Sequence, residues 1–491
     1  MLTETDALNS HDATLDGEFA LDIGGELVEP TTWVDDLDPA TGAVLARVAS
    51  ATAQEVGDAV EAAKAAAPAW AALHPTARGS LLRDLARLVR RDAEQLARIE
   101  TRDTGKPLTQ GRADIAAAAR YFDFYGSVIE GFQGDTVPLG SAAIAMVDHE
   151  PHGVTGHVIP WNYPAQISAR SIGAALAVGN ATVVKPDVVA PLSTLHFARL
   201  AREAGFPAGT INVVPGDGPT AGAALTAHDD IAHVSFTGSV ASGRLVAEAV
   251  ARRGRAALLE LGGKSAHVVL EGADLDRAAP VIARALLLHA GQTCTAGTRV
   301  IVHRSLHAAL VDKLAVLFEA ATVGRGLDDP TVGPVVTRRQ QERVAGFVER
   351  AQAEGMAIAA QATIPDGLDG FYAAPTLFGD VPQGTELFGE EVFGPVLAVT
   401  PVDSDEEAIA AAENTRYGLT AAVWCQDIDR ALKTARSLNV GQAMVNGYAA
   451  GGGVELPFGG TKDSGYGREK GVEALREYSR TRMLFIDLAG A

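Results

Sequence analysis

Through the middle of this chain, short apolar runs rich in β-branched residues alternate with longer stretches of helical periodicity. In the first such series, strand-like runs at 155–159, 181–185, 209–214 and 233–237 are separated by helical patterns such as 193–203. Strands that alternate with helices pair in parallel, because a parallel connection needs a long crossover back to the same edge of the sheet. The alternation therefore predicts an α/β fold built on a parallel sheet.

A second series of the same kind follows two consecutive glycines, Gly262 and Gly263. Its expected strands and helices lie at 298–302, 396–401, 421–424, 274–290, 305–320 and 338–354. The chain has 491 residues, and a single core stops growing at about 250–300 residues. We therefore predict two α/β units, the first formed by 1–132 and 152–262 and the second by 263–462.

Other segments differ in pattern from these two series. Amphipathic helices are expected at 51–72 and 78–104, and Gly105 ends the second of them. The segment 133–151 and the tail 479–491 are short, apolar and poor in helix signals. Because strands detached from a core offer free edges for pairing, we predict that these two segments form a small β element for oligomerisation.

Composition restricts the partners and the compartment. The formal net charge of −20 disfavours nucleic acid and anionic membranes, which require clustered Lys and Arg. No run approaches the roughly 18 apolar residues of a membrane helix, and the first residues are acidic where a secretory signal is basic. Two cysteines and scattered histidines favour neither a disulfide framework nor a metal site. We expect a globular, cytoplasmic protein without a metal.

Two local patterns suggest acid–base and nucleophilic chemistry. Cys294 lies among small and polar residues between glycines, where a thiol can reach a substrate, although a single cysteine is more often structural. Cys425, in an apolar strand-like run, is typical of an inert thiol. Glu260 stands in apolar sequence directly before two glycines, so it either pairs with a buried cation or has a raised pKa and acts as a base.

Two further patterns suggest binding of negative charge. Asn162 follows a strand and lies between prolines, which is suited to a preorganised oxyanion donor or, alternatively, to a rigid turn. The strand at 233–237 leads into Gly238, Ser239 and a helical stretch, and a helix N-terminus with free amides binds phosphate. The G-x-G-x-x-G fingerprint is absent.

These four patterns, in this order, resemble the aldehyde dehydrogenase superfamily of the non-acylating, NAD(P)-dependent kind. The resemblance covers nearly the whole chain. It includes Val-Val-Lys-Pro around Lys185, Glu-Val-Phe-Gly-Pro from Glu391, Asn-Thr-Arg-Tyr-Gly from Asn414, and the runs 457–462 and 464–469. Together these motifs are far more specific than any one of them.

The resemblance implies a coenzyme-binding domain in the first unit, a catalytic domain in the second, and a homodimer or homotetramer. It implies that Cys294 is the nucleophile, that Glu260 is the general base, that Asn162 and the Cys294 amide hold the oxyanion, and that Glu469 can relay protons. The implied coenzyme contacts are Ile159, Pro160, Trp161, Lys185, Gly218, Gly238, Ser239, Leu261, Glu391 and Phe393.

The sequence departs from the family pattern at the coenzyme site. Val188 stands where the family commonly has a Glu that accepts from the adenosine ribose. Asp187 is one residue early and points to the opposite face of an extended chain. We expect NAD as the coenzyme, and NADP stays possible because no carboxylate at 188 repels a 2′-phosphate.

Other departures concern the substrate, whose implied contacts are Arg170, Tyr163 and Thr295. Many members have Trp-Lys where this chain has Arg170 and Ser171, and the missing Lys puts the usual proton route in doubt. Members that oxidise succinate semialdehyde carry an Arg at the position of Arg170, whereas others with Tyr163 and this Arg oxidise aryl or bulky aldehydes. The loop 446–455 lacks the aromatic side chains that narrow the pocket in small-aldehyde enzymes, so we expect a roomy site.

We therefore predict oxidation of a bulky, aryl or carboxylate-bearing aldehyde to its acid through a hemithioacetal and a thioester on Cys294. The alternatives are a succinate-semialdehyde enzyme anchored by Arg170, a coenzyme A-acylating enzyme, a silent binding protein and a cysteine hydrolase. Glu260 counts against the acylating branch, and Lys185 with Gly238 counts against a hydrolase that needs no nucleotide.

Overall fold

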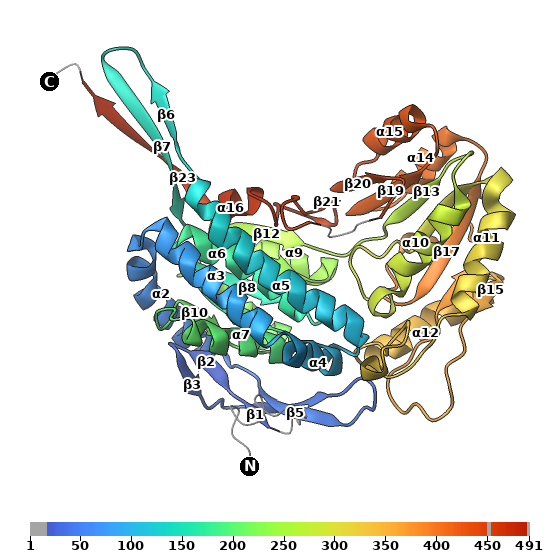
Figure 1. Cartoon of the computed structure of the whole chain (residues 1–491), viewed down its shortest axis with the longest axis horizontal. Coiled ribbons are helices and arrows are strands. Elements are labelled where there is room, and N and C mark those ends of the chain that lie inside the picture. The colour runs from blue at the N-terminus through green and yellow to red at the C-terminus, as the bar shows by residue number, and fades with distance from the viewer. Residues whose placement is uncertain (1–16, 449–452, 489–491) are drawn as a thin grey trace.

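A computed structural model describes residues 17–448 and 453–488, and two large sheets organise them (Figure 1). The first sheet has eight strands, and its central neighbours β12, β11, β8, β9 and β10 are parallel. In spatial order the strands are β22 (Gly465–Tyr466), β12 (Ala256–Glu260), β11 (His233–Thr237), β8 (Val154–Ile159), β9 (Ala181–Pro186), β10 (Ile211–Val213), β2 (Leu21–Ile23) and β3 (Glu26–Val28).

The second sheet has seven strands and is parallel except at its edge strand β15. In spatial order its strands are β15 (Ile358–Gln361), β16 (Thr376–Phe378), β17 (Val396–Val402), β14 (Arg299–His303), β13 (Ala266–Val269), β19 (Thr420–Trp424) and β20 (Gln442–Val445). The α/β class with parallel sheets, predicted from the alternating pattern, is confirmed.

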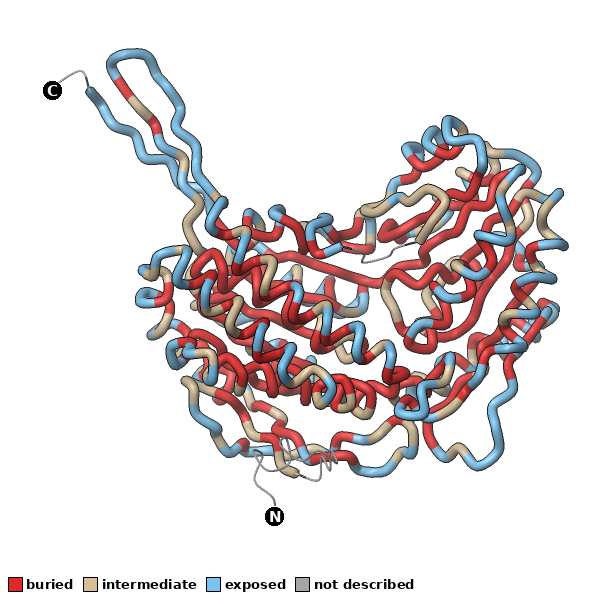
Figure 2. Tube along the Cα trace, viewed as in Figure 1, coloured by how far each residue is buried: buried red, intermediate tan, exposed pale blue. Residues whose placement is uncertain are grey.

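Helices cover both sheets, and the strands between them are buried along most of their length (Figure 2). Around the first sheet lie α2 (Ala53–Ala72), α3 (Pro75–Arg91), α4 (Ala93–Thr104), α5 (Leu108–Val128), α6 (Pro164–Val178), α7 (Leu192–Glu203), α8 (Ala223–Ala227), α9 (Val240–Ala251) and α16 (Glu473–Glu477). The second sheet is covered by α10 (Leu275–Leu287), α11 (Arg304–Glu319), α12 (Arg338–Ala353), α13 (Glu386–Gly389), α14 (Asp405–Glu413) and α15 (Ile428–Ser437).

Two smaller sheets complete the body. The first joins β1 (Glu18–Phe19), β5 (Val44–Ala49) and β4 (Trp33–Leu37), and the second joins β18 (Tyr417–Gly418) to β21 (Thr461–Lys462). No helix in the described part of the chain is long and apolar enough to cross a membrane.

The single helix expected at 78–104 is wrong, because α3 and α4 are separate helices that meet at Asp92. The backbone of Asp92 leaves the helical region, with φ −94° and ψ 15°. Its carboxylate accepts hydrogen bonds from Arg91 (2.7 Å) and Arg199 (3.2 Å), and Arg199 is far away in the sequence. Gly105 ends α4 in the left-handed conformation, as the sequence indicated.

A three-stranded antiparallel arm projects from the body beside the first sheet (Figure 1). Its strands are β6 (Asp135–Pro138), β7 (Ala143–Pro151) and β23 (Ser479–Asp487). The arm therefore pairs the two segments that the sequence analysis assigned to one β element. Exposed apolar side chains on it include Val137, Met146, Met483, Leu484 and Phe485. A role in oligomerisation, like the domain boundaries, stays a prediction.

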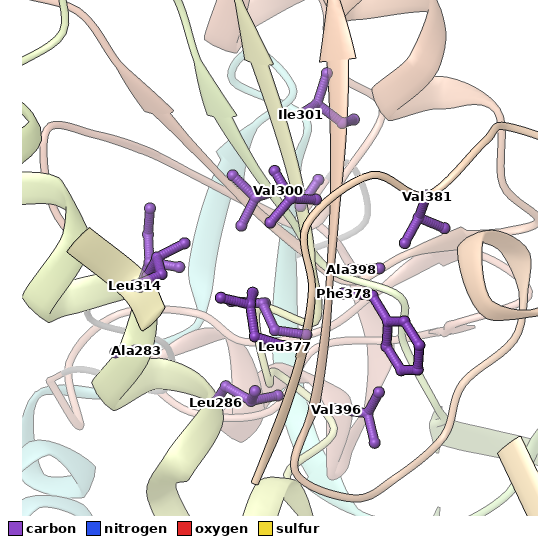
Figure 3. Close-up of a cluster of buried hydrophobic side chains, with 14 of the residues drawn as sticks. Ala283, Leu286, Val300, Ile301, Leu314, Leu377, Phe378, Val381, Val396 and Ala398 are labelled. Carbon is purple, nitrogen blue, oxygen red and sulfur yellow. The ribbon is translucent and has the colours of Figure 1, made fainter. Parts of the chain in front are cut away.

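The second unit has a large apolar core between its sheet and the helices α10 and α11. Figure 3 shows Ala283 and Leu286 of α10 and Leu314 of α11 beside side chains from β14, β16 and β17. Leu286 has no exposed surface. One face of α10 is therefore fixed in the core.

This packing predicts the effect of truncating α10. Leu286→Ala should lower the free energy of unfolding by roughly 2–5 kcal/mol, because it removes buried methyl groups and leaves a cavity. Val316→Ala on α11, where the side chain is 66% exposed, should change it by less than about 0.5 kcal/mol. Urea unfolding followed by tryptophan fluorescence measures both, and equal losses would contradict the placement of Leu286.

Candidate active site

The backbone just before Cys294 is not helical, although the sequence predicted a helix to residue 290. The helix α10 ends at Leu287, and His289, Ala290 and Gly291 all have positive φ values, of 48°, 51° and 73°. A Cβ at Gly291 would lie 2.3 Å from the carbonyl oxygen of Gly394. Only glycine permits this contact, which holds the Cys294 loop against the run that begins at Glu391.

Cys294 lines two cavities, one of about 480 Å³ and one of about 340 Å³. The first cavity is also lined by the predicted residues Asn162 and Glu260 and by the predicted coenzyme contacts Pro160, Trp161, Gly238, Ser239, Leu261, Glu391 and Phe393. The second is lined by all three predicted substrate contacts, Tyr163, Arg170 and Thr295. Cys294 therefore lies between the cavity lined by most of the predicted coenzyme contacts and the cavity lined by the predicted substrate contacts.

Asn162 is buried beside the Cys294 loop. Its Nδ2 donates to the carbonyl oxygen of Gln292 (2.9 Å), and its own carbonyl oxygen accepts from Nζ of Lys106 (3.1 Å). Lys106 is fully buried, bonds Glu100 (3.1 Å) and Asp114 (2.5 Å), and lies 4.4 Å from the centre of the Tyr163 ring. Lys106 thus fixes the backbone that carries Asn162.

Glu260 ends strand β12 and is 3% exposed. Neither carboxylate oxygen has a hydrogen-bond partner within the described residues. Burial raises the pKa of Glu260 well above its ordinary value, and the nearby charge of Glu469 raises it further. Of the two interpretations from sequence, this geometry favours a base with a raised pKa over a paired carboxylate.

Burial also raises the pKa of the Cys294 thiol, to about 12, and the field of Arg170 opposes this shift. The thiol is therefore protonated at neutral pH. A cysteine in this state needs a base to become a nucleophile, because the thiolate is the reactive form.

Arg170 lines the second cavity, but its guanidinium forms a buried ion pair with Glu469. The guanidinium also lies 4.9 Å from the centre of the Phe458 ring. The other oxygen of Glu469 accepts from the hydroxyl of Ser235 (3.3 Å), which accepts from Ser171 (3.1 Å). A chain of hydroxyls therefore leads from Ser171 to Glu469.

The first cavity contains groups suited to a nucleotide. Ser239 caps α9, a helix of 12 residues, so the free amides of its first turn face the cavity. The rings of Trp161 and Phe393 meet edge to face at 5.4 Å. Glu391 accepts from the amide of Gly263 (2.9 Å), and burial raises its pKa to about 7.

The remaining coenzyme candidates, Ile159, Lys185 and Gly218, do not belong to the lining of this cavity. Ile159 ends β8 and is buried. Lys185, near the end of β9, is buried and donates to the carbonyl oxygens of Pro186 (3.1 Å) and Gly216 (2.6 Å). Gly218 begins the turn Gly218–Gly222, whose last residue lies next to Lys185.

The structure also shows the surroundings of position 188, where the sequence departs from the family pattern near Lys185. Val188 packs on the apolar core, and the carboxylate of Asp187 accepts from the amide of Val189 (3.1 Å) in a local turn. Asp187 is therefore engaged with its own backbone.

Sequence reasoning missed Lys106 and two residues of α12. Gln340 donates to the carbonyl of Phe393 (2.7 Å), and Arg343 donates to the carbonyl of Glu391 (2.6 Å), so α12 holds the Glu391 run. Tyr448 also lines the second cavity, contrary to the expectation that loop 446–455 brings no aromatic ring. Residues 449–452 of that loop lie outside the described residues.

Comparison with known proteins agrees with this geometry. Residues 28–484 match the aldehyde dehydrogenase family. A betaine aldehyde dehydrogenase of Rhizobium leguminosarum bv. trifolii (strain WSM2304) is 40% identical over 473 residues, covering 95% of this chain and 96% of the relative. The crystal structure of a protein from Burkholderia cenocepacia is 46% identical with a TM-score of 0.94, covering 96% of this chain and 100% of that one.

A third similar protein, an aldehyde dehydrogenase from Bacillus cereus solved as an NAD+ complex, is 38% identical with a TM-score of 0.94, covering 97% of this chain and 98% of that one. These TM-scores show that the two-sheet α/β fold of this chain is the aldehyde dehydrogenase fold. The chain belongs to the aldehyde dehydrogenase family. The predicted enzyme class is confirmed.

The raised pKa of Cys294 predicts how the free enzyme is alkylated. Below the pKa of about 12, the thiolate fraction rises tenfold per pH unit, so the rate with iodoacetamide should rise by about tenfold per unit between about pH 7 and pH 9. Cys294→Ala is the control, because the remaining Cys425 is 1% exposed. A rate that levels off near pH 7 would show an ionised thiol and contradict the prediction.

Proposed function

We propose that this enzyme oxidises an aldehyde to the carboxylic acid with reduction of NAD, through a thioester on Cys294. The observation that carries the proposal is the position of Cys294 in the wall of both cavities. A thiol placed there can attack a carbonyl in one cavity while a hydride leaves toward the other. The NAD+ complex of the similar Bacillus cereus enzyme supports this choice of coenzyme.

The residues of the first cavity fit a nicotinamide dinucleotide. The α9 N-terminus at Gly238 and Ser239 suits the pyrophosphate, and Glu391 with Phe393 suits the nicotinamide ribose and ring. Lys185, which lies outside this lining, would reach the adenosine ribose by exchanging one of its bonds to a backbone carbonyl. When bound, NAD supplies the hydride acceptor. NADP stays possible, because Val188 places no carboxylate against a 2′-phosphate.

The reaction uses three groups of this chain in turn. Glu260 takes the proton of the Cys294 thiol, and the thiolate adds to the aldehyde carbon. Nδ2 of Asn162 and the Cys294 amide then hold the oxyanion of the hemithioacetal. After hydride loss, Glu260 gives up the thiol proton and, basic again, takes a proton from water. The hydroxide adds to the thioester carbonyl, the C–S bond breaks, and the Cys294 sulfur regains a proton as the acid is released. Glu469, linked to the site through Arg170, is the candidate relay that returns Glu260 to its basic form.

Glu260 also supports hydrolysis over transfer to coenzyme A, because a base beside the thioester activates water.

For the substrate, the second cavity supports a bulky, aryl or carboxylate-bearing aldehyde. The pairing of Arg170 with Glu469 counts against the alternative in which Arg170 anchors succinate semialdehyde. The same buried guanidinium at the Phe458 ring counts against betaine aldehyde, since a quaternary ammonium needs free aromatic faces.

We further propose the domain roles and assembly expected from the sequence. The unit formed by 1–132 and 152–262 would bind the coenzyme. The unit formed by 263–462 would carry the nucleophile. The arm, with its exposed apolar strand β23, supports pairing of copies into a dimer or tetramer. Two free cysteines are consistent with a cytoplasmic enzyme.

The reaction is tested by following absorbance of the reduced nicotinamide with succinate semialdehyde, benzaldehyde and a medium-chain alkanal, each with NAD and NADP. Cys294→Ala should abolish turnover, and Glu260→Gln should lower kcat by roughly 10²–10⁴-fold, because the amide cannot accept a proton. Cys425→Ala is the matched control and should keep full activity. Turnover that survives in Cys294→Ala would reject the thioester mechanism.

A further inference from the structure

The wall of the second cavity includes one acidic and two basic side chains: Asp114, Arg170 and Arg284. Asp114 is paired with Lys106, and Arg170 is paired with Glu469. Arg284 forms no ion pair and no side-chain hydrogen bond within residues 17–448 and 453–488. It is therefore a positive charge in the wall that the protein leaves uncompensated.

The position of Arg284 on α10 follows from the packing of that helix. Ala283 and Leu286 of α10 face the core of the second unit (Figure 3). The cavity is lined instead by Val281, Arg284, Ala285 and Leu288, which recur at helical spacing on another face. Because the core fixes one face of α10, the guanidinium of Arg284 is held on the cavity side.

The exposure of the lining residues distinguishes an outer end of the cavity from an inner end. Arg284 is exposed and Leu288 is 37% exposed, so this end opens to solvent. Arg170 and Phe458, at 6% and 2%, belong to the inner end, where Cys294 also lies. The wall also includes the rings of Tyr163 and Tyr448, whose hydroxyls bond Thr293 and Thr295 on either side of Cys294. The cavity thus joins a cationic mouth to a nucleophile at its inner end along a largely apolar and aromatic path.

We propose that Arg284 recognises a carboxylate at the end of the substrate remote from the aldehyde. The substrate class is an aldehyde whose anionic group is separated from the carbonyl by an apolar or aryl body. This inference rests on the proposed function, since the aldehyde must reach Cys294. It replaces Arg170 by Arg284 as the anchor.

A cationic residue at the mouth of the cavity also counteracts the charge of the whole chain for an anionic substrate. With a formal net charge of −20, the protein repels anions at long range. A guanidinium at the mouth offsets this locally, and its fork of donors matches both oxygens of a carboxylate. Because Arg284 is partly solvated, the expected gain is modest, about five- to tenfold in kcat/KM.

The test compares 4-carboxybenzaldehyde with 4-methylbenzaldehyde, which have similar shapes but differ in charge. For Arg284→Gln, kcat/KM should fall about five- to tenfold with the carboxylate and stay within about twofold with the methyl compound. The loss should lie in KM, because an interaction made equally in the ground state and transition state leaves kcat unchanged. Arg284→Lys should retain part of the preference for the carboxylate substrate, since lysine keeps the positive charge but lacks the paired donors of the guanidinium.

Arg277→Gln is the matched control. Arg277 is an exposed arginine on the same helix, and it lies outside the lining of both cavities. It should leave both substrates unchanged. An equal fall with both aldehydes in Arg284→Gln, no fall with either, or the same selective loss in Arg277→Gln would overturn the inference. If the wild type oxidised neither aldehyde with NAD or NADP, the proposed function itself would fail.

Discussion

The hydrogen bonds between the parallel strands of the first sheet position the groups that the first unit contributes to the site. Their register pairs Thr237 with Glu260 and Val158 with Lys185, so the carboxyl ends of β8, β9, β11 and β12 lie along one edge. Ligands of open α/β sheets bind at this edge, because the loops that leave it converge there. Asn162, Lys185, Gly238 and Glu260 therefore come from four separate motifs but one edge of one sheet, whereas Cys294, Glu391 and Phe393 come from the second unit.

Buried charge is the second constraint, and this chain meets it by pairing. Lys106 pairs with Glu100 and Asp114 behind Asn162, and Arg170 pairs with Glu469. Removing one partner of such a pair would leave a buried charge uncompensated, at a cost of several kcal/mol. A charged residue in the cavity wall is therefore not by itself a substrate anchor. Arg170 is already paired with Glu469, whereas Arg284 has no such partner among the described residues.

The sequence predicted the parts of the structure that depend on local pattern. Strands and their flanking helices alternate visibly, and the Cys294, Glu260 and Asn162 motifs are short and contiguous. It missed α6 because all but one of its side chains are buried, so the helix shows no polar face. The sequence predicted one helix in place of α3 and α4. The break lies at Asp92, whose carboxylate accepts from Arg199, and Arg199 is distant in the sequence. Lys106 and Arg343 act through long-range contacts that no local pattern reveals.

The two reacting groups illustrate why the paired Arg170 still matters for chemistry. Burial disfavours a charge on Cys294 and on Glu260 alike, and the field of Arg170 opposes both shifts. Transfer of the thiol proton to an ionised Glu260 moves one negative charge between two sites that feel the same guanidinium. This step leaves the net charge of the buried site unchanged, so it adds no further desolvation cost. Arg170 therefore favours an anionic site without selecting which of the two residues carries the charge.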